Sequence, residues 1–341
     1  MFLHPPLSVF LMLVSYFQKK NNSVERKKIK INDTLPNNTV WIDLIEPCKE
    51  EEQYIEKILS IEAPTEAEME KFEVISPFYV EKGVNYMTVT VLDKACKDYP
   101  DSIAITFILT AKYLITTRYD NPKSFDYINS WLMRNKNQVC THNFILMKIS
   151  ECIVDCSAEI LEKVGNEIDT LLKVVFEKPV GRKKNYSDYY NDIIRQIGFT
   201  GNIISKNREA LVSLNRMITF FSQIDNGQYI SKKESRLMIK HISREISSLS
   251  EYANFLSQRN SFLLDATLGM ISVEQNIIIK VFTVAAAVFM PPTVIASIYG
   301  MNFTEMPMLH WPWPYGYYGS IMLIIISALA PYVYFKRKGW F

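Results

Sequence analysis

The chain has 341 residues, enough for about two folded domains at ~100–200 residues each. Its 38 Lys and Arg against 36 Asp and Glu give a net charge of +2, which excludes a strong field for nucleic acids or other polyanions. The 48% hydrophobic and 13% aromatic content excludes a disordered or collagen-like chain, and five cysteines do not suggest a secreted disulfide framework.

The first 17 residues are apolar and precede Lys19 and Lys20. A signal peptide would carry its positive charge before the apolar core. Pro5 and Pro6 leave too few helix-compatible residues for a membrane span, so we expect a first β-strand within residues 9–17. The basic run at 19–30 has no interleaved aromatic side chains and is expected to be a solvated loop that binds no nucleic acid.

Residues 1–125 are predicted to form an N-terminal cytosolic α/β domain. Segments 86–92, 103–109 and 113–117 are rich in β-branched and aromatic residues, which is typical of strands. Segment 50–61 places apolar side chains at the spacing of an amphipathic helix.

Residues 126–280 are predicted to be mainly long helices, at about 142–177, 186–224 and 231–299, the last continuing into the membrane. At ~1.5 Å per residue the last helix would be on the order of 100 Å long. Apolar residues recur on it at 3-4 spacing, as in a helix-packing seam: Ile239, Ile242, Ile246, Leu249, Ala253 and Leu256.

Two other patterns in this region have a plain interpretation that we prefer. Cys140, His142, Cys152 and Cys156 lack the spacing of a standard zinc site, so reduced and partly buried cysteines are favoured. Acids recur on one face of the helix at 142–177, which is usually a solvated face: Glu151, Asp155, Glu159 and Glu162.

Segments 281–304 and 306–335 contain no Asp, Glu, Lys or Arg and are separated by Glu305. Each exceeds the ~20 apolar residues needed to cross a bilayer, which favours transmembrane helices at about 281–300 and 315–335 over two core helices of a soluble protein. Lys280 and the basic tail at 336–341 flank the pair, while the short connecting loop has no Lys or Arg. Both termini are therefore expected in the cytoplasm, and the loop outside.

A second 3-4 stripe on the long helix is small and polar. It comprises Asp265, Gly269, Ser272, Asn276, Ile279, Thr283, Ala286, Met290, Thr293 and Ser297. Such a stripe suits either helix packing or a pore wall, and we leave both open. A single hairpin cannot enclose a pore, so a channel would need several copies around an axis.

The first span ends in Tyr299-Gly300-Met301-Asn302-Phe303, with Met306-Pro307 and the basic-aromatic tail beyond. Together with Trp41-Ile42-Asp43-Leu44 near the start, these motifs resemble the CorA family of divalent-cation channels. The resemblance implies an α+β cytosolic domain with long helices, followed by a two-helix transmembrane hairpin. It also implies a homopentameric funnel in the cell inner membrane, whose long helix lines a pore for Mg²⁺, with Co²⁺ or Ni²⁺ as further ions.

The resemblance assigns roles to individual residues. Gly300, Met301 and Asn302 would form the outer selectivity ring, with Gly300 carbonyls and Asn302 amides holding a cation through its water shell. Thr293 and Asn276 correspond to polar rings of the pore. The remaining assignments are the hydrophobic constrictions at Met290, Phe282 and Ile279, and the acidic inner ring at Asp265.

Departures from the family pattern keep alternatives open. Met308 replaces an acid common in the family's outer loop, which leaves Glu305 as that loop's acid and keeps a zinc transporter of the same superfamily as one alternative. A non-conducting, membrane-anchored helical sensor or scaffold is the other. His241 stands where the family's Mg²⁺-sensing aspartate is expected, so no sensor residue is assigned. No enzyme motif is found, and Mg²⁺ is expected as cargo rather than as a cofactor.

Overall fold

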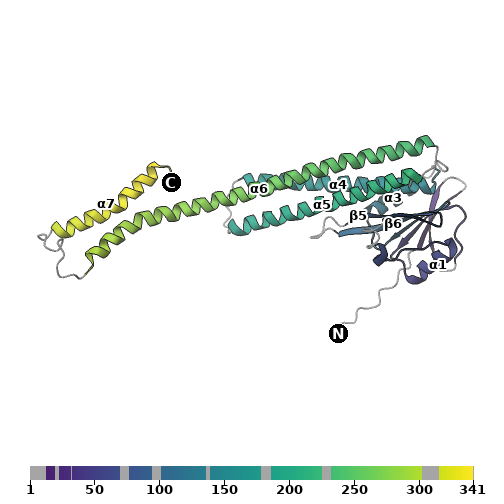
Figure 1. The fold of residues 1–341 in the computed structure, drawn as a ribbon, viewed down its shortest axis with the longest axis horizontal. Coiled ribbons are helices and arrows are strands. Elements are labelled where there is room, and N and C mark those ends of the chain that lie inside the picture. Colours follow the sequence, from purple (N-terminus) through teal and green to yellow (C-terminus); the bar gives the residue numbers. More distant parts are fainter. Residues whose placement is uncertain are drawn as a thin grey trace, which may run out of the picture. The chain divides into compact units, whose positions relative to one another are not determined.

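The computed structural model describes residues 13–19, 23–31, 33–69, 77–93, 101–135, 139–177, 186–224, 232–301 and 315–340. The chain divides into two compact units, Met1–Leu264 and Asp265–Phe341. The first unit contains a β-sheet and long helices, and the second contains the C-terminal apolar helices (Figure 1). The predicted fold class, an α+β domain with long helices followed by two C-terminal apolar helices, is confirmed.

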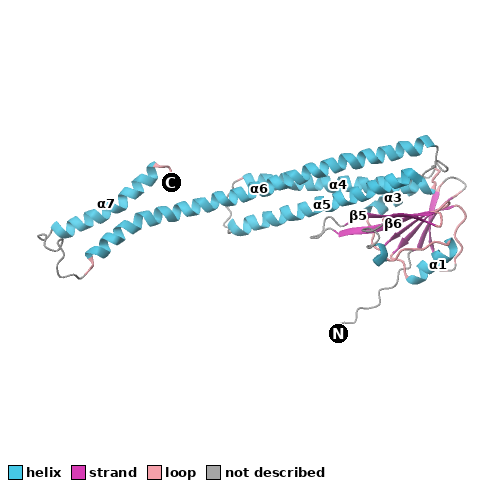
Figure 2. Ribbon diagram, in the orientation of Figure 1, coloured by secondary structure: helices cyan, strands magenta, loops and turns pink. Residues whose placement is uncertain are grey.

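A seven-stranded sheet forms the N-terminal part, in the order β2-β1-β3-β7-β6-β5-β4 (Figure 2). All neighbours pair antiparallel except β3 and β7, which are parallel. The strands are β1 Leu13–Gln18, β2 Val24–Ile29, β3 Thr39–Ile45, β4 Phe78–Glu81, β5 Val84–Asp93, β6 Asp101–Leu109 and β7 Leu114–Arg118. The predicted strands at 86–92, 103–109 and 113–117 are therefore confirmed as β5, β6 and β7.

The predicted loop at 19–30 is wrong over residues 24–29, which form β2 on the edge of the sheet. Its four central residues are charged and exposed, while Ile29 is buried. Hydrogen bonding to β1 makes this segment a strand, because an edge strand can expose both of its faces and still pair its backbone on one side.

Alternation along β3 gives the sheet two different faces. Ile42 and Leu44 belong to a buried cluster with Ile55 of α1 (Lys49–Leu59), the helix predicted at 50–61. Trp41 instead stacks on Tyr16 at 4.1 Å and lies near Phe125 of α3 (Lys123–Arg134). Helices therefore cover both faces, and the alternation of side chains along each strand supplies both apolar layers.

A buried ion pair joins the two parallel strands. Arg118 of β7 donates from Nη2 to Asp43 Oδ2 of β3 at 2.8 Å and from Nε to Oδ1 at 3.1 Å. Thr116 donates its hydroxyl to the same carboxylate at 2.6 Å, and the guanidinium lies over the Phe125 ring. Two charges with almost no exposed surface are stable here because each has several direct partners.

Long helices complete the first unit. These are α4 (His142–Phe176), α5 (Tyr186–Ile224) and the first part of α6 (Lys232–Tyr299), close to the predicted bounds. The 3-4 seam on α6 is confirmed, since Ile242, Ile246, Ala253 and Leu256 are buried. Gly165 of α4 allows a close helix approach, because an added Cβ would lie 2.8 Å from the Tyr252 hydroxyl of α6.

The second unit holds the rest of α6 and α7 (Tyr315–Arg337). Both helices have a stretch long and apolar enough to cross a membrane, and almost none of that surface is buried inside the protein. After α7, Trp340 lies 5.9 Å from the Lys280 ammonium, a distance at which a cation attracts an aromatic face.

Candidate functional site

The small polar stripe predicted from the sequence lies on one continuous helix, α6. From Asp265 to Ser297 it is free of any break in the helical backbone, although Pro291 and Pro292 lie within it. At ~1.5 Å per residue these ends are about 50 Å apart along the axis. Asp265, Asn276 and Thr293 are all exposed, so their polar atoms are free to face water.

Three hydroxyl groups of the stripe have a common orientation. Thr293 Oγ1 donates to the Phe289 carbonyl at 2.7 Å, Thr283 Oγ1 to the Ile279 carbonyl at 2.8 Å, and Ser272 Oγ to the Leu268 carbonyl at 3.1 Å. Each hydroxyl proton is thus held by the backbone one turn earlier. What each side chain offers outward is oxygen lone pairs, which accept hydrogen bonds from the water around a cation or contact the cation directly.

Large apolar side chains lie within the stripe, at Ile279 and Met290, and beside it, at Phe282. Ile279, Phe282 and Met290 are 60%, 72% and 65% exposed, although residues of this kind are usually buried. In this unit they are covered neither by α7 nor by the remainder of α6. They are therefore available to contact lipid, another copy of the chain, or one another across an axis.

Pro291 and Pro292 lie between Met290 and Thr293. A proline has no N–H to donate, so the carbonyls of Ala287 and Val288 lack their usual helical partners. The helix nevertheless continues through this point to Tyr299. Two further carbonyl oxygens in the span are thereby released from the helical ladder, a feature that the sequence signalled but that the stripe pattern did not include.

The helix ends at the predicted selectivity motif. The Gly300 amide donates to the Ala296 carbonyl at 2.9 Å and the Met301 amide to the Ile298 carbonyl at 3.3 Å. An added Cβ on Gly300 would lie 3.3 Å from the Ala296 oxygen, so glycine suits this close turn. Asn302 and Glu305 lie outside the described residues, and their assigned roles stay predictions.

The cysteines singled out in the sequence belong to the packed core of the first unit. Cys140, Cys152 and Cys156 are free and buried. Burial raises the pKa of Cys140 and Cys152 to about 11 and that of Cys156 to about 12, which disfavours the thiolate that a zinc ligand requires. The reduced, buried interpretation is confirmed for these three residues.

The acidic face of α4 is largely solvated, as predicted. Asp155, Glu159 and Glu162 are exposed, and the Tyr127 hydroxyl donates to Glu159 at 3.0 Å. Partial burial, followed by the charge of Glu151, raises the pKa of Asp155 above its usual value, whereas the charges of Lys148 and, to a smaller extent, His241 on α6 oppose this shift. His241 is itself exposed, and its Nδ1 lies 3.4 Å from Glu245 Oε2.

Comparison with known proteins gives a consistent result. The sequence model of the family described as CorA-like Mg²⁺ transporter protein matches residues 36–337. The chain is 30% identical over 334 residues to the "Magnesium transport protein CorA" of Escherichia coli K12, covering 96% of this chain and 100% of that protein.

Solved structures share the fold at lower identity. The complete CorA magnesium transporter of Methanocaldococcus jannaschii superposes with a TM-score of 0.75 at 16% identity, covering 98% of this chain and 100% of that one. The ZntB cytoplasmic domain of Vibrio parahaemolyticus gives 0.54 at 12% identity, over 76% of this chain and 98% of that domain.

Proposed function

The chain belongs to the CorA-like Mg²⁺ transporter family, and from that premise we propose that it conducts Mg²⁺ through a homopentameric pore lined by α6. It is a membrane protein of magnesium transport with two C-terminal transmembrane helices, and it is not an enzyme. The pentamer, the pore wall, the cytoplasmic placement of both termini and the selectivity residues are the parts that we propose.

One observation carries the pore assignment. The stripe on α6 from Asp265 to Ser297 is uncharged after its first residue, and three of its hydroxyls turn their lone pairs outward. Oxygen acceptors without net charge suit an ion that keeps its water shell, because they hold it weakly enough to release it. In a ring of copies, Thr293 and Asn276 would provide such oxygens at two levels of the pore.

The apolar residues fit the same arrangement. Ile279, Phe282 and Met290 would face the axis between the polar levels, where rings of apolar side chains close a pore by excluding water. Asp265 would place one carboxylate per copy at the inner mouth and concentrate cations there. Gly300, Met301 and Asn302 would form the outer ring, with Glu305 attracting cations from outside.

The oxygen-rich stripe favours Mg²⁺ over Zn²⁺. The stripe residues of α6 offer hydroxyl, amide and carboxylate oxygens, whereas zinc prefers nitrogen and thiolate sulfur. The zinc alternative rests on Met308 and on a shared fold with the ZntB domain, which is evidence about fold alone. Flux into liposomes, measured with a Mg²⁺ dye and a Zn²⁺ dye on one purified sample, separates the two cargoes. It also separates both from a non-conducting scaffold.

Asn302→Ala is the central test. The substitution removes one amide per copy from the proposed ring, so Mg²⁺ flux should fall steeply, by about tenfold or more, while the oligomer still assembles. If Asn302 only caps the end of α6, the variant should lose little stability and transport normally.

The control is Asn215→Ala on α5, an amide far along the chain from the membrane segments. Size-exclusion chromatography must first show the same oligomer for both variants and the parent protein. Near-normal flux through a well-assembled Asn302→Ala protein would remove the selectivity assignment.

A further inference from the structure

The basic ends of the two transmembrane helices carry positive charge that the chain itself does not neutralise. Four cations and no acid occur in residues 275–301 and 315–340: Lys280, Lys336, Arg337 and Lys338. The first precedes the uncharged span of α6, and the other three follow that of α7. All four are exposed, and none forms an ion pair with an acid in the part of the chain that the structure describes.

The end of α7 is closed by a turn that returns Trp340 to the helix. Gly339 has a φ of 70°, and its amide donates to the Lys336 carbonyl at 3.2 Å. The Trp340 amide donates to the Phe335 carbonyl at 3.2 Å. This pair of bonds is the Schellman motif, which favours glycine at the left-handed position. The Trp340 ring lies against Phe335, with centroids 4.9 Å apart, so the last described residues are tied to the helix.

Trp340 brings the two basic ends together. The Lys280 ammonium of α6 lies 5.9 Å from the centre of the Trp340 ring. Beside it on the chain, the Lys338 ammonium lies 5.5 Å from the centre of the Tyr334 ring. Aromatic faces attract cations without neutralising them, so the charge of both ammonium groups stays available to an anion.

Exposed apolar surface leads up to these cations. Leu329, Val333 and Arg337 follow one another at four-residue spacing on α7, so they share one face of the helix. Leu329 is 53% and Val333 43% exposed, and the membrane-crossing stretch of α7 buries none of its surface inside the protein. A cation at the end of an exposed apolar face suits a molecule with an anionic head and apolar chains, whereas a soluble anion would leave that face uncovered.

We propose that the cluster of Lys280, Arg337, Lys338 and Trp340 binds the head group of one anionic phospholipid per chain. The Arg337 guanidinium donates two hydrogen bonds to the lipid phosphate, and the two ammonium groups balance the remaining charge. The acyl chains lie along the apolar face of α7 that ends at Arg337. The bound lipid thereby links the start of the α6 span to the end of the α7 span. The site depends on the two transmembrane helices and does not depend on ion conduction.

Native mass spectrometry of the purified full-length protein in detergent tests this proposal, because it counts bound lipids directly. The probes are anionic dioleoylphosphatidylglycerol, zwitterionic dioleoylphosphatidylcholine, and glycerol phosphate, which has the anionic group without acyl chains. Phosphatidylglycerol should bind about tenfold more tightly than either other probe and saturate at one molecule per chain. Equal binding of phosphatidylcholine would overturn the proposal by showing that charge is irrelevant. Equal binding of glycerol phosphate would overturn it by identifying a soluble anion as the ligand.

Two variants and a control locate the site. Lys280→Gln and Arg337→Gln should each weaken phosphatidylglycerol binding about fivefold, the effect of one cation at a membrane surface. Lys240→Gln removes an exposed cation from the part of α6 that belongs to the first unit, and this variant should bind like the parent protein. Equal binding by the parent protein and both cluster variants would overturn the proposal.

A relocated charge separates a defined site from a general attraction between anionic lipid and positive charge. Lys280→Gln combined with Gln275→Lys keeps the number of cations but moves one of them about 7 Å along α6 and onto another face. This variant should bind as weakly as Lys280→Gln alone, and binding like that of the parent protein would overturn the proposal. All substituted side chains are exposed, so the variants are expected to fold, which circular dichroism checks. Since no ion flux is measured, failure here leaves the Mg²⁺ proposal untouched.

Discussion

The buried pair of Asp43 and Arg118 allows a quantitative test of what stabilises the centre of the sheet. Asp43 is 0% exposed and Arg118 1% exposed, and the pair spans the parallel junction between β3 and β7. Replacing Arg118 with Met keeps much of the side-chain volume but leaves the Asp43 carboxylate buried without its cation. Only the Thr116 hydroxyl then remains of the three side-chain donor contacts described above.

The expected cost is about 3–5 kcal/mol, the usual range when one partner of a buried ion pair is removed. The Asp120 carbonyl and the Asn121 side chain also lose their bonds from Arg118 Nη1. A loss of this size should lower the unfolding midpoint by on the order of 10 °C in a unit of this length.

Urea and thermal unfolding of the purified protein, followed by tryptophan fluorescence, provide the measurement. Trp41 is fully buried and donates from Nε1 to Thr116 at 3.0 Å, so its emission reports on this region. Arg134→Met, an exposed arginine on α3, is the matched control and should change stability by about 0.5 kcal/mol or less.

A double variant separates a lost attraction from an orphaned charge. Asp43→Leu combined with Arg118→Met removes both charges and should recover much of the loss caused by Arg118→Met alone. The reasoning is refuted if Arg118→Met costs no more than Arg134→Met. It is equally refuted if the double variant loses as much stability as Asp43→Leu and Arg118→Met lose separately, added together.

Three other outcomes are expected. Gly165→Ala should lower stability by about 1 kcal/mol because its methyl group would meet the Tyr252 hydroxyl. Adding Tyr252→Phe to that variant should restore the lost stability. Urea unfolding midpoints of the parent protein and the two variants test both expectations. Because the pKa of Asp155 is raised in the folded state, folding is disfavoured progressively as pH rises above the ordinary value of 3.8. Asp155→Asn should therefore raise the thermal midpoint at pH 7 and not at pH 3, with Glu162→Gln as the control; an equal gain at both pH values would contradict this. Alkylation at pH 7.5, read out peptide by peptide, should leave the thiols of Cys140, Cys152 and Cys156 unmodified until the protein is unfolded. Rapid labelling of these thiols in the native protein would disprove their burial.

Sustained patterns made the long elements predictable. The membrane segments and α6 show their character over tens of residues, and the 3-4 seam at Ile242 and Ile246 is buried as the spacing predicts. Strand β2 was missed because four consecutive charged residues leave no apolar alternation to detect. Its pairing with β1 depends on backbone groups, which sequence patterns do not display.

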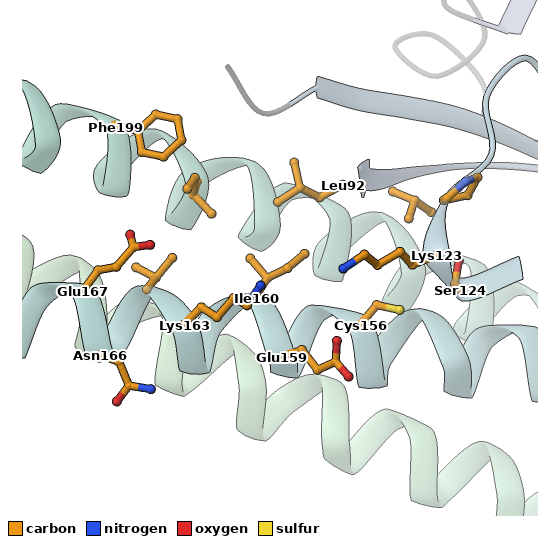
Figure 3. A pocket seen from close by; sticks show the side chains of 14 residues that line it. Leu92, Lys123, Ser124, Cys156, Glu159, Ile160, Lys163, Asn166, Glu167 and Phe199 are labelled. Atoms are coloured by element: carbon orange, nitrogen blue, oxygen red, sulfur yellow. The ribbon is translucent and has the colours of Figure 1, made fainter. Parts of the chain in front are cut away.

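Less of the candidate pore site than of the fold could be predicted from the sequence. The spacing of Thr283 and Thr293 placed them on one face of a helix, but the direction of each hydroxyl proton depends on the backbone carbonyl one turn earlier. A cavity in the first unit, lined in part by Leu92, Ser124 and Phe199 (Figure 3), could not be anticipated, because these residues come together only through tertiary packing. A ring at Asn302 requires several copies, which no single sequence displays.

The edges of the sheet limit how copies of this chain can associate. At one edge, β2 presents Glu25, Arg26, Lys27 and Lys28 to solvent, so a strand from another molecule would have to bring its own side chains against a dense band of charge. At the other edge, β4 is only four residues long and ends in a tight hairpin turn, with Lys82 and Gly83 both at positive φ. Neither edge is suited to the open-ended strand addition that produces fibres. Contacts between copies are thereby directed to the helices, where association can close into a finite ring.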